Sequence, residues 1–182
     1  MISRILFLDV DGVLNHIEWA ERRPDRRKIT NDMNEEDVER IRAEYGFDPV
    51  CVEHLSTLVE RAGCDIVISS TWRKMGLGQS GHLHMQRMLT HRGFKYRDRI
   101  IGSTPVLDRM VGSMGLLVAQ PRGLEIQAWL DAHESVSNFV ILDDESDMAH
   151  LSSRLVQTNY NDGGLRVDHV HEVVDLFEGS SG

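Results

Sequence analysis

The segment Ile5-Leu6-Phe7-Leu8-Asp9-Val10-Asp11-Gly12-Val13-Leu14-Asn15 joins four apolar residues to two carboxylates and a glycine. The apolar run predicts a buried strand over about residues 4–9, and the glycine predicts a turn after it. Because side chains alternate along a strand, we expect Asp9 and Asp11 to point into one crevice at its carboxyl end. Two adjacent carboxylates repel each other unless a cation lies between them or one keeps a proton. The segment therefore predicts a magnesium-dependent catalytic site.

A calcium-binding loop is the alternative interpretation of an Asp-x-Asp-Gly sequence that follows a strand. Such a loop requires a further Asp or Asn at its fifth position and a Glu at its twelfth. Counted from Asp9, those two positions hold Val13 and Ala20. The calcium ligands are absent, and the magnesium interpretation is preferred.

Length and composition predict a single globular domain over residues 1–178, followed by a flexible Gly-Ser tail at 179–182. A chain of 182 residues can bury one core and is too short for two ordinary domains. No apolar run is long enough to cross a bilayer, and the first residues lack the pattern of a secretory signal. Cys51 and Cys64 form neither a redox motif nor a zinc motif. These features predict a cytoplasmic protein with no membrane partner.

Net charge limits the partners that the chain is expected to hold. The formal net charge is −9, whereas proteins that hold nucleic acid by bulk electrostatics usually present a basic face. We therefore expect no stable nucleic-acid complex, although brief contact with a nucleic-acid end is compatible with this charge. Five basic residues crowd one segment after the first motif: Arg22, Arg23, Arg26, Arg27 and Lys28. This basic cluster is either a solvated loop or a contact for a phosphodiester backbone.

Strand-like and helix-like segments alternate along the rest of the chain. Strands are predicted over residues 65–69, 99–102, 139–142 and 153–158, and helices over residues 35–44, 49–63, 82–92, 123–132 and 167–177. The stretches 16–34 and 106–119 have no clear periodicity. Alternation of this kind predicts an α/β fold in which helices cover both faces of a parallel sheet. Ligands of such sheets bind at the carboxyl ends of the strands.

Asp-x-Asp-Gly-Val after an apolar strand resembles the first motif of the haloacid dehalogenase (HAD) superfamily of phosphohydrolases. The resemblance implies a three-layer, Rossmann-like HAD fold with a parallel central sheet and a small cap insertion, placed here at residues 16–48. It also implies Mg²⁺ as the cofactor. Asp9 matches the nucleophile that forms an aspartyl-phosphate, and Asp11 matches the general acid and base. Gly12 is assigned to substrate binding.

The second HAD motif matches the end of the strand predicted at residues 65–69. A hydroxyl there, followed by free backbone N–H groups, can hydrogen-bond phosphoryl oxygens as charge builds on them. Ser69 matches the family's hydroxyl position as a catalytic residue, and Ser70 is a near alternative. We assign Ser70, Thr71 and Arg73 to substrate binding. Trp72 fits either a contact with the leaving group or a place in the core.

The third HAD motif is a cation at the start of the helix that precedes the last motif. Arg122 occupies that position in Pro121-Arg122-Gly123-Leu124-Glu125-Ile126. The family more often has Lys there, but the planar guanidinium group of Arg also suits phosphate oxygens. Lys74 is the alternative residue for neutralising the phosphate.

The fourth HAD motif matches Leu142-Asp143-Asp144-Glu145-Ser146-Asp147, which directly follows an apolar strand. Asp143 matches a metal ligand. Mg²⁺ prefers octahedral oxygen coordination, which Asp9, Asp143, the backbone carbonyl of Asp11 and a phosphate oxygen would supply together. We expect Asp144 and Asp147 to orient waters and neighbouring side chains.

The histidines offer a different metal interpretation, chiefly through His82-Leu83-His84 and His169-Val170-His171. In a helix, an His-x-His sequence directs its two rings to different faces, and no third ligand lies nearby in the sequence. We therefore predict that these histidines bind no metal.

The four motifs together narrow the resemblance within the superfamily. They read Asp-Val-Asp-Gly-Val-Leu-Asn (9–15), Ile-Ser-Ser-Thr-Trp-Arg (68–73), Arg-Gly-Leu-Glu-Ile-Gln-Ala-Trp-Leu (122–130) and Ile-Leu-Asp-Asp (141–144). They are similar to the phosphatase modules of nucleic-acid repair, such as the 3′-phosphatase half of polynucleotide kinase-phosphatases. No kinase phosphate loop is present.

The resemblance implies a Mg²⁺-dependent phosphatase that acts on nucleic-acid 3′ ends, DNA or RNA, or on nucleotides. A small cap leaves the site open, which suits a bulky substrate better than an enclosed metabolite. A small-metabolite or mononucleotide phosphatase is one alternative. A non-catalytic phosphate-binding or interaction module is another, although such a module is expected to lose Asp9 or Asp11.

Overall fold

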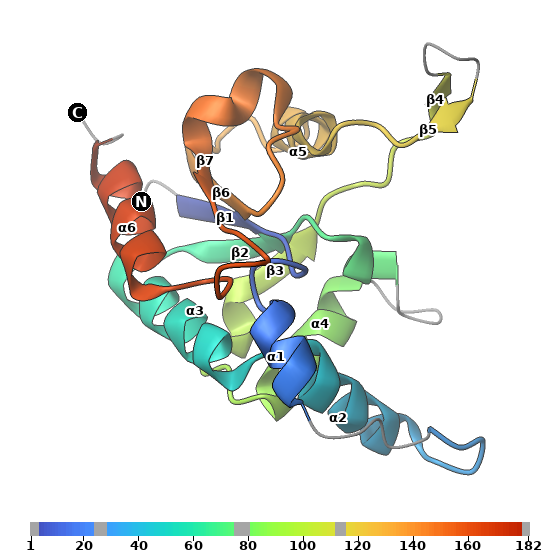
Figure 1. Cartoon of the computed structure of the whole chain (residues 1–182). Coiled ribbons are helices and arrows are strands. Elements are labelled where there is room, and N and C mark those ends of the chain that lie inside the picture. Colours follow the sequence, from blue (N-terminus) through green and yellow to red (C-terminus); the bar gives the residue numbers. More distant parts are fainter. Residues whose placement is uncertain (1–3, 24–28, 75–80, 112–115, 180–182) are drawn as a thin grey trace.

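The centre of the fold is a five-stranded parallel sheet, seen in a computed structural model that describes residues 4–23, 29–74, 81–111 and 116–179. The strands are β1 (Arg4–Leu8), β2 (Asp65–Ile68), β3 (Ile100–Ser103), β6 (Asn138–Asp143) and β7 (Leu155–Gln157). Their order across the sheet is β3-β2-β1-β6-β7 (Figure 1). The chain runs outward from β1 to β3, then returns to the other side of β1. The carboxyl ends of β1 and β6 therefore flank the point where the strand order reverses.

Helices lie on both faces of this sheet. The α-helices are α1 (Ile17–Arg22), α2 (Glu35–Gly46), α3 (Pro49–Ala62), α4 (Gly81–His91), α5 (Arg122–Asp131) and α6 (Val167–Gly179). The 3₁₀ helices are η1 (Thr71–Lys74), η2 (Arg97–Arg99) and η3 (Ala149–Arg154). One core joins the sheet to α2, α3, α4 and α6, and a second core joins it to α5 and η3 (Figure 1). This arrangement confirms the predicted three-layer α/β fold.

Strand β1 contributes to both cores because its side chains alternate between the two faces of the sheet. Leu6 and Leu8 belong to the core under α3 and α6, whereas Ile5 and Phe7 belong to the core under α5. The Phe7 ring packs edge-on against Trp129, with their centroids 5.4 Å apart. The first apolar run of the chain is therefore the central strand, buried on both sides.

The helix boundaries read from the sequence agree with the structure where capping residues mark them. The Asn34 side chain accepts a hydrogen bond from the Asp37 backbone N–H at the start of α2. Asp48 accepts one from Val50 N–H at the start of α3, ahead of Pro49 at the first helical position. Gly63 ends α3 with a φ of 61°, the left-handed conformation that glycine adopts most easily.

Two features were not predicted from the sequence. The polar stretch after the first motif contains α1, which pairs Glu18 with Arg22 across one turn and buries none of its residues. The stretch 106–119 contains a two-stranded antiparallel sheet of β4 (Met110–Val111) and β5 (Leu117–Val118). Both elements are short and lack the apolar periodicity that marks a buried strand or helix.

The structure also bears on the predictions for the C-terminal tail, the basic cluster, the cysteines and membrane spans. Helix α6 continues to Gly179, the first residue of the predicted tail, and residues 180–182 lie outside the described part. Residues 26–28 of the basic cluster also lie outside it. Cys51 and Cys64 are buried free thiols, and burial raises the pKa of each to about 12. Across the described ranges, no helix is both long enough and apolar enough to cross a membrane.

Candidate active site

Asp9 and Asp143 lie next to each other at the carboxyl ends of β1 and β6. The parallel register pairs Leu8 with Leu142, and the Asp9 backbone N–H donates to the Leu142 carbonyl at 3.0 Å. Together with Asp144, the two residues offer carboxylate oxygens that lie within 4.8 Å of one another. Asp143 is almost fully buried, and its Oδ2 atom has no hydrogen-bond partner. A buried carboxylate oxygen that accepts no hydrogen bond, beside two further carboxylates, fits the oxygen ligands that Mg²⁺ prefers.

The titration of these carboxyl groups reflects their crowding. Burial, and then the negative charge of Asp9, raise the pKa of Asp143 from 3.8 to about 8. Burial also raises the pKa of Asp9 to about 6, against the lowering effects of the Arg122 charge and of a hydrogen bond from Ser70. Without a cation, the pair therefore retains protons well above the usual range of aspartate.

Gly12 permits the third carboxylate to approach. Its φ is 74°, and a β-carbon at this position would collide with the Asp144 side chain. We predicted Gly12 as a substrate-binding residue; the structure shows that its lack of a side chain makes space for Asp144. The structure groups Asp144 directly with Asp9 and Asp143, whereas the sequence placed it in a supporting position. The side chain of Asp11 does not belong to this group.

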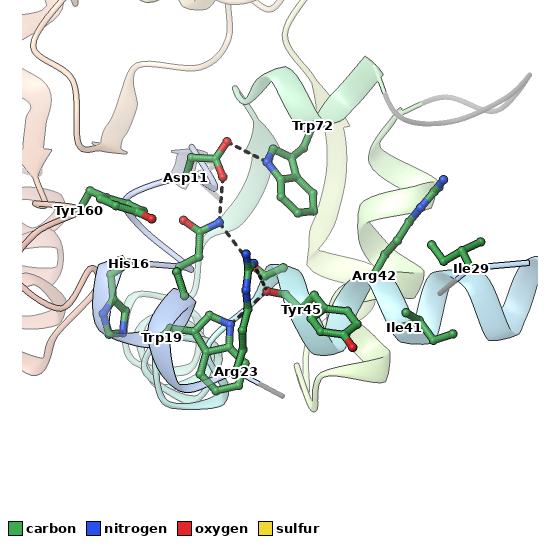
Figure 2. Close-up of a pocket in the computed structure, with 13 residues that line it drawn as sticks. Asp11, His16, Trp19, Arg23, Ile29, Ile41, Arg42, Tyr45, Trp72 and Tyr160 are labelled. Carbon is green, nitrogen blue, oxygen red and sulfur yellow. Dashed lines mark hydrogen bonds between the residues drawn. The ribbon is translucent and has the colours of Figure 1, made fainter. Parts of the chain in front are cut away.

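Asp11 reaches the crevice by a different route from the predicted one. Strand β1 ends at Leu8, so the turn that follows, rather than strand alternation, positions the Asp11 carboxylate. That carboxylate accepts hydrogen bonds from Trp72 Nε1 at 2.9 Å and from Asn15 Nδ2 at 2.8 Å (Figure 2). It lies close enough to Asp9 for its charge to raise the Asp9 pKa. Sequence analysis left the role of Trp72 open and missed that of Asn15.

The two serines after β2 have different surroundings. The Ser70 hydroxyl hydrogen-bonds to the Asp9 carboxylate, which lowers the Asp9 pKa. Ser69 is fully buried, and its Oγ atom has no hydrogen-bond partner. Thr71 is exposed at the start of η1. The structure thus places the Ser70 hydroxyl on Asp9, and the division of the two serines between catalysis and substrate binding stays a prediction.

Arg122 is the cation that the structure brings to the carboxylates. Its Nη2 lies 3.4 Å from Asp9 Oδ1, and its Nε lies 3.6 Å from Asp143 Oδ2. Lys74, the alternative, is exposed at the end of η1 and has no ion pair with these carboxylates in the described structure. The start of α5 therefore delivers one positive charge between the two buried aspartates.

A second ion pair holds Arg122 in place. Arg122 Nη1 lies 3.5 Å from Glu125 Oε2, and Arg73 Nη2 lies 2.7 Å from the same oxygen. Arg73 also donates to the Ser70 carbonyl at 2.6 Å, and it is buried. The predicted contact of Arg73 with substrate stays a prediction, because the contacts in this structure are with protein groups. Glu125 was missed in the sequence, where its spacing of three residues from Arg122 on one helix was the available signal.

Asp147 supports the same helix. The α5 N-cap residue, Pro121, makes no side-chain capping bond. Asp147 Oδ2 instead accepts from the Arg122 backbone N–H at 3.0 Å, and the Asp147 carbonyl accepts from Gly123 N–H at 3.2 Å. The loop after β6 thus caps the helix that carries Arg122.

The sequence predicted that the histidines of the two His-x-His sequences bind no metal. His84 is buried and lies 3.0 Å from Glu39, and His169 accepts a hydrogen bond from a backbone N–H. Neither pair belongs to a group of possible metal ligands within the described ranges. A different buried group, His16 with Asp48 and Cys51, does bring possible ligands together. Its histidine and aspartate already bond to each other at 2.8 Å.

The family described as "HAD domain in Swiss Army Knife RNA repair proteins" matches residues 5–170 of the chain. The match covers all four motifs, and the chain therefore belongs to this family. Membership supports a hydrolase of the phosphatase type, and HAD domains typically use a divalent metal. No curated protein and no solved structure matches the chain.

Metal-free protein is expected to lose stability as pH rises from about 4 to about 8. The folded-state pKa values of Asp9 and Asp143 are raised, so their contribution is complete below pH 3.8 and lost through about 6 and 8. Mg²⁺ competes with these protons and should therefore raise the Tm more at pH 8.5 than at pH 6. Thermal unfolding with EDTA or Mg²⁺ measures both effects. An equal rise in Tm with Mg²⁺ at the two pH values would contradict the expectation. Asp143→Asn is the control and should remove most of the rise in Tm that Mg²⁺ causes.

Glu125→Gln is expected to lower the free energy of unfolding by about 3 kcal/mol, because it leaves the buried Arg73 charge without its partner. Urea denaturation of the two proteins measures the difference. Glu134→Gln, an exposed change beyond the end of the same helix, is the matched control and should change stability little. Equal losses for both variants would show that the buried pair contributes nothing specific.

Proposed function

We propose that this protein is a Mg²⁺-dependent phosphatase that hydrolyses phosphomonoesters through an aspartyl-phosphate on Asp9. The observation that supports this most directly is the meeting of Asp9, Asp143 and Arg122 at the strand ends of a HAD-family chain. The two carboxylates can hold a metal ion, and the arginine beside them can bind the oxygens of a phosphoryl group.

The cation would be held by Asp9, Asp143 and Asp144, with the backbone carbonyl of Asp11 as a further ligand. Their clustered oxygens and the Asp143 Oδ2 atom, which accepts no hydrogen bond, support this assignment. When bound, Mg²⁺ supplies positive charge that offsets the carboxylates and the phosphate oxygens.

Asp9 performs the first step. Its free carboxylate oxygen attacks phosphorus, and an O–P bond forms as the bond between phosphorus and the leaving oxygen breaks. Asp11 gives a proton to that leaving oxygen. In the second step Asp11 takes a proton from water, the water oxygen attacks phosphorus, and the bond to Asp9 breaks to release phosphate. The hydrogen bonds from Trp72 and Asn15 hold the Asp11 carboxylate in place for both transfers.

The remaining residues stabilise the transferring group. The Arg122 guanidinium, already between Asp9 and Asp143, neutralises the phosphoryl oxygens and shields them from the carboxylates. The Ser69 hydroxyl lacks a protein partner and donates to a phosphoryl oxygen. Ser70, Thr71 and Gly12 line the substrate side. Arg73 acts through Glu125 as a positioning residue for Arg122.

Nucleic-acid 3′ ends or nucleotides are the proposed substrates, because the family is described from RNA repair proteins. The net charge of −9 fits brief contact with a nucleic-acid end better than a stable complex. Two buried free thiols fit a reducing, cytoplasmic setting.

Asp9→Asn is expected to lower the Mg²⁺-dependent hydrolysis of p-nitrophenyl phosphate by at least about a thousandfold, because it removes the nucleophile. Asp98→Asn, an exposed change in η2, is the control and should retain activity. Comparing kcat/KM on a 3′-phosphorylated oligonucleotide with that on free nucleotides then identifies the substrate class. Wild-type protein inert toward every phosphomonoester would reject the phosphatase, and higher activity on free nucleotides would favour the mononucleotide alternative.

Arg122→Gln is expected to lower kcat/KM by about a hundredfold, since one charged donor to the transferring group is lost. Arg122→Lys keeps the charge that most of the family has at this position, and it should restore part of the loss. Steady-state kinetics on p-nitrophenyl phosphate, with Tm as a check on folding, measures both variants. A loss confined to Lys74→Gln would assign the role to Lys74 instead.

A further inference from the structure

A cleft of about 770 Å³ opens beside Asp11, between α1, the end of α2 and Trp72 (Figure 2). Its volume lies within the range of about 300–1,000 Å³ that is typical of small-ligand sites. We propose that this cleft binds the terminal nucleoside of a phosphorylated nucleic-acid end, with the nucleobase against its aromatic walls. The inference rests on the proposed phosphatase activity and names the substrate class of that same site.

Asp11 fixes which part of a substrate the cleft would hold. Its carboxylate lines the cleft, and the proposed mechanism has it donate a proton to the leaving oxygen. The leaving group therefore begins at Asp11 and extends into the cleft, away from Asp9 and Arg122. The cleft would therefore hold the alcohol part of the phosphomonoester, and the residues that line the cleft would select the substrate.

The walls of the cleft are unusually rich in aromatic residues. Two of the three tryptophans and two of the three tyrosines in the chain line it: Trp19, Trp72, Tyr45 and Tyr160. Apolar contacts from Ile29 and Ile41 complete the lining on the side of α2. A flat aromatic ligand gains most from such walls, because every nucleobase can stack on an indole or a phenol ring.

The two indoles are held in fixed positions. Trp72 donates to Asp11, its ring lies 5.3 Å from that of Phe47, and Gly46 leaves space for it, since a β-carbon there would lie 2.6 Å from the indole. Trp19 donates to the Tyr45 carbonyl at 3.2 Å, and the Arg92 guanidinium lies 4.9 Å from its ring centroid. Rings fixed in this way lose little freedom when a base stacks on them.

Charge at the cleft also fits a nucleic-acid end. Arg23 and Arg42 line it, and neither forms an ion pair in the described structure. Asp11 is the one carboxylate among the described residues of the lining. In a chain of net charge −9, two arginines without acidic partners suit the phosphodiester that follows the terminal nucleoside. A compact sugar phosphate would leave both arginines and the aromatic walls unused.

The substrate itself provides the first test. We expect kcat/KM for a 3′-phosphorylated tetranucleotide to exceed that for the same molecule with an abasic 3′-terminal residue by about tenfold, the size of one base-stacking contact. Equal values for the two substrates would overturn the nucleoside site and leave the phosphatase standing.

A matched pair of variants in α2 tests the charge. Arg42→Gln removes a guanidinium from the cleft, whereas Arg40→Gln removes one that pairs with Asp37 outside it. We expect only Arg42→Gln to lower, by about threefold to tenfold, the ratio of kcat/KM on the tetranucleotide to that on p-nitrophenyl phosphate. Equal ratios for the two variants would overturn the contact with the phosphodiester.

Binding without turnover separates this inference from the proposed function. The Asp9→Asn protein is titrated with both tetranucleotides, and quenching of tryptophan fluorescence reports the Kd. We expect tighter binding of the substrate that carries the base, by about tenfold. That preference in a protein whose wild type hydrolyses no phosphomonoester would reject the phosphatase and retain the site. No preference would overturn the site, whatever the enzyme activity.

Discussion

Repulsion between Asp9 and Asp143 is the constraint around which this protein is arranged. The parallel pairing of β1 with β6 places the two carboxyl groups side by side in a buried position, where burial raises the pKa of both and the charge of Asp9 raises that of Asp143 further. A hydrophobic core alone would never favour that arrangement. It persists because the sheet is buried on both faces and fixes the register, and because Arg122 brings an opposite charge between the pair. The fold thus supplies the rigidity that the site needs.

The charges that stabilise the site form a chain from the ends of β1 and β6 through α5 to η1. Arg122 contacts the aspartates, Glu125 contacts Arg122, and the buried Arg73 contacts Glu125 and the Ser70 carbonyl. The segment after β2 and the start of α5 are therefore tied together beneath the crevice. Each charge in this chain is partly neutralised by the next, which allows several ionised groups to remain away from water. The position of Arg122 depends on residues that need never touch a substrate.

Sequence patterns predicted the parts of the molecule that local rules control. Apolar runs located the central strands, Asn34 and Asp48 marked helix starts, and strand ends located Asp9 and Asp143. The partnership of Arg73 with Glu125 joins distant segments, and only the packed fold brings them together. Helix α1 buries none of its residues, so it left no apolar pattern to read. The turn after Leu8, rather than strand alternation, positions Asp11, because β1 ends at Leu8, one residue before the predicted end of the strand.

The backbone at Gly12 has a consequence for how the protein can vary. Every other amino acid adds a β-carbon, and at this position that carbon would occupy the space of Asp144 while forcing a left-handed conformation. A substitution at Gly12 would therefore displace the carboxylates of Asp9, Asp143 and Asp144 rather than disturb either hydrophobic core. Natural or engineered variants at this position should therefore retain a folded chain with a disturbed carboxylate cluster. A residue with no side chain is thus one of the positions where this protein tolerates substitution poorly.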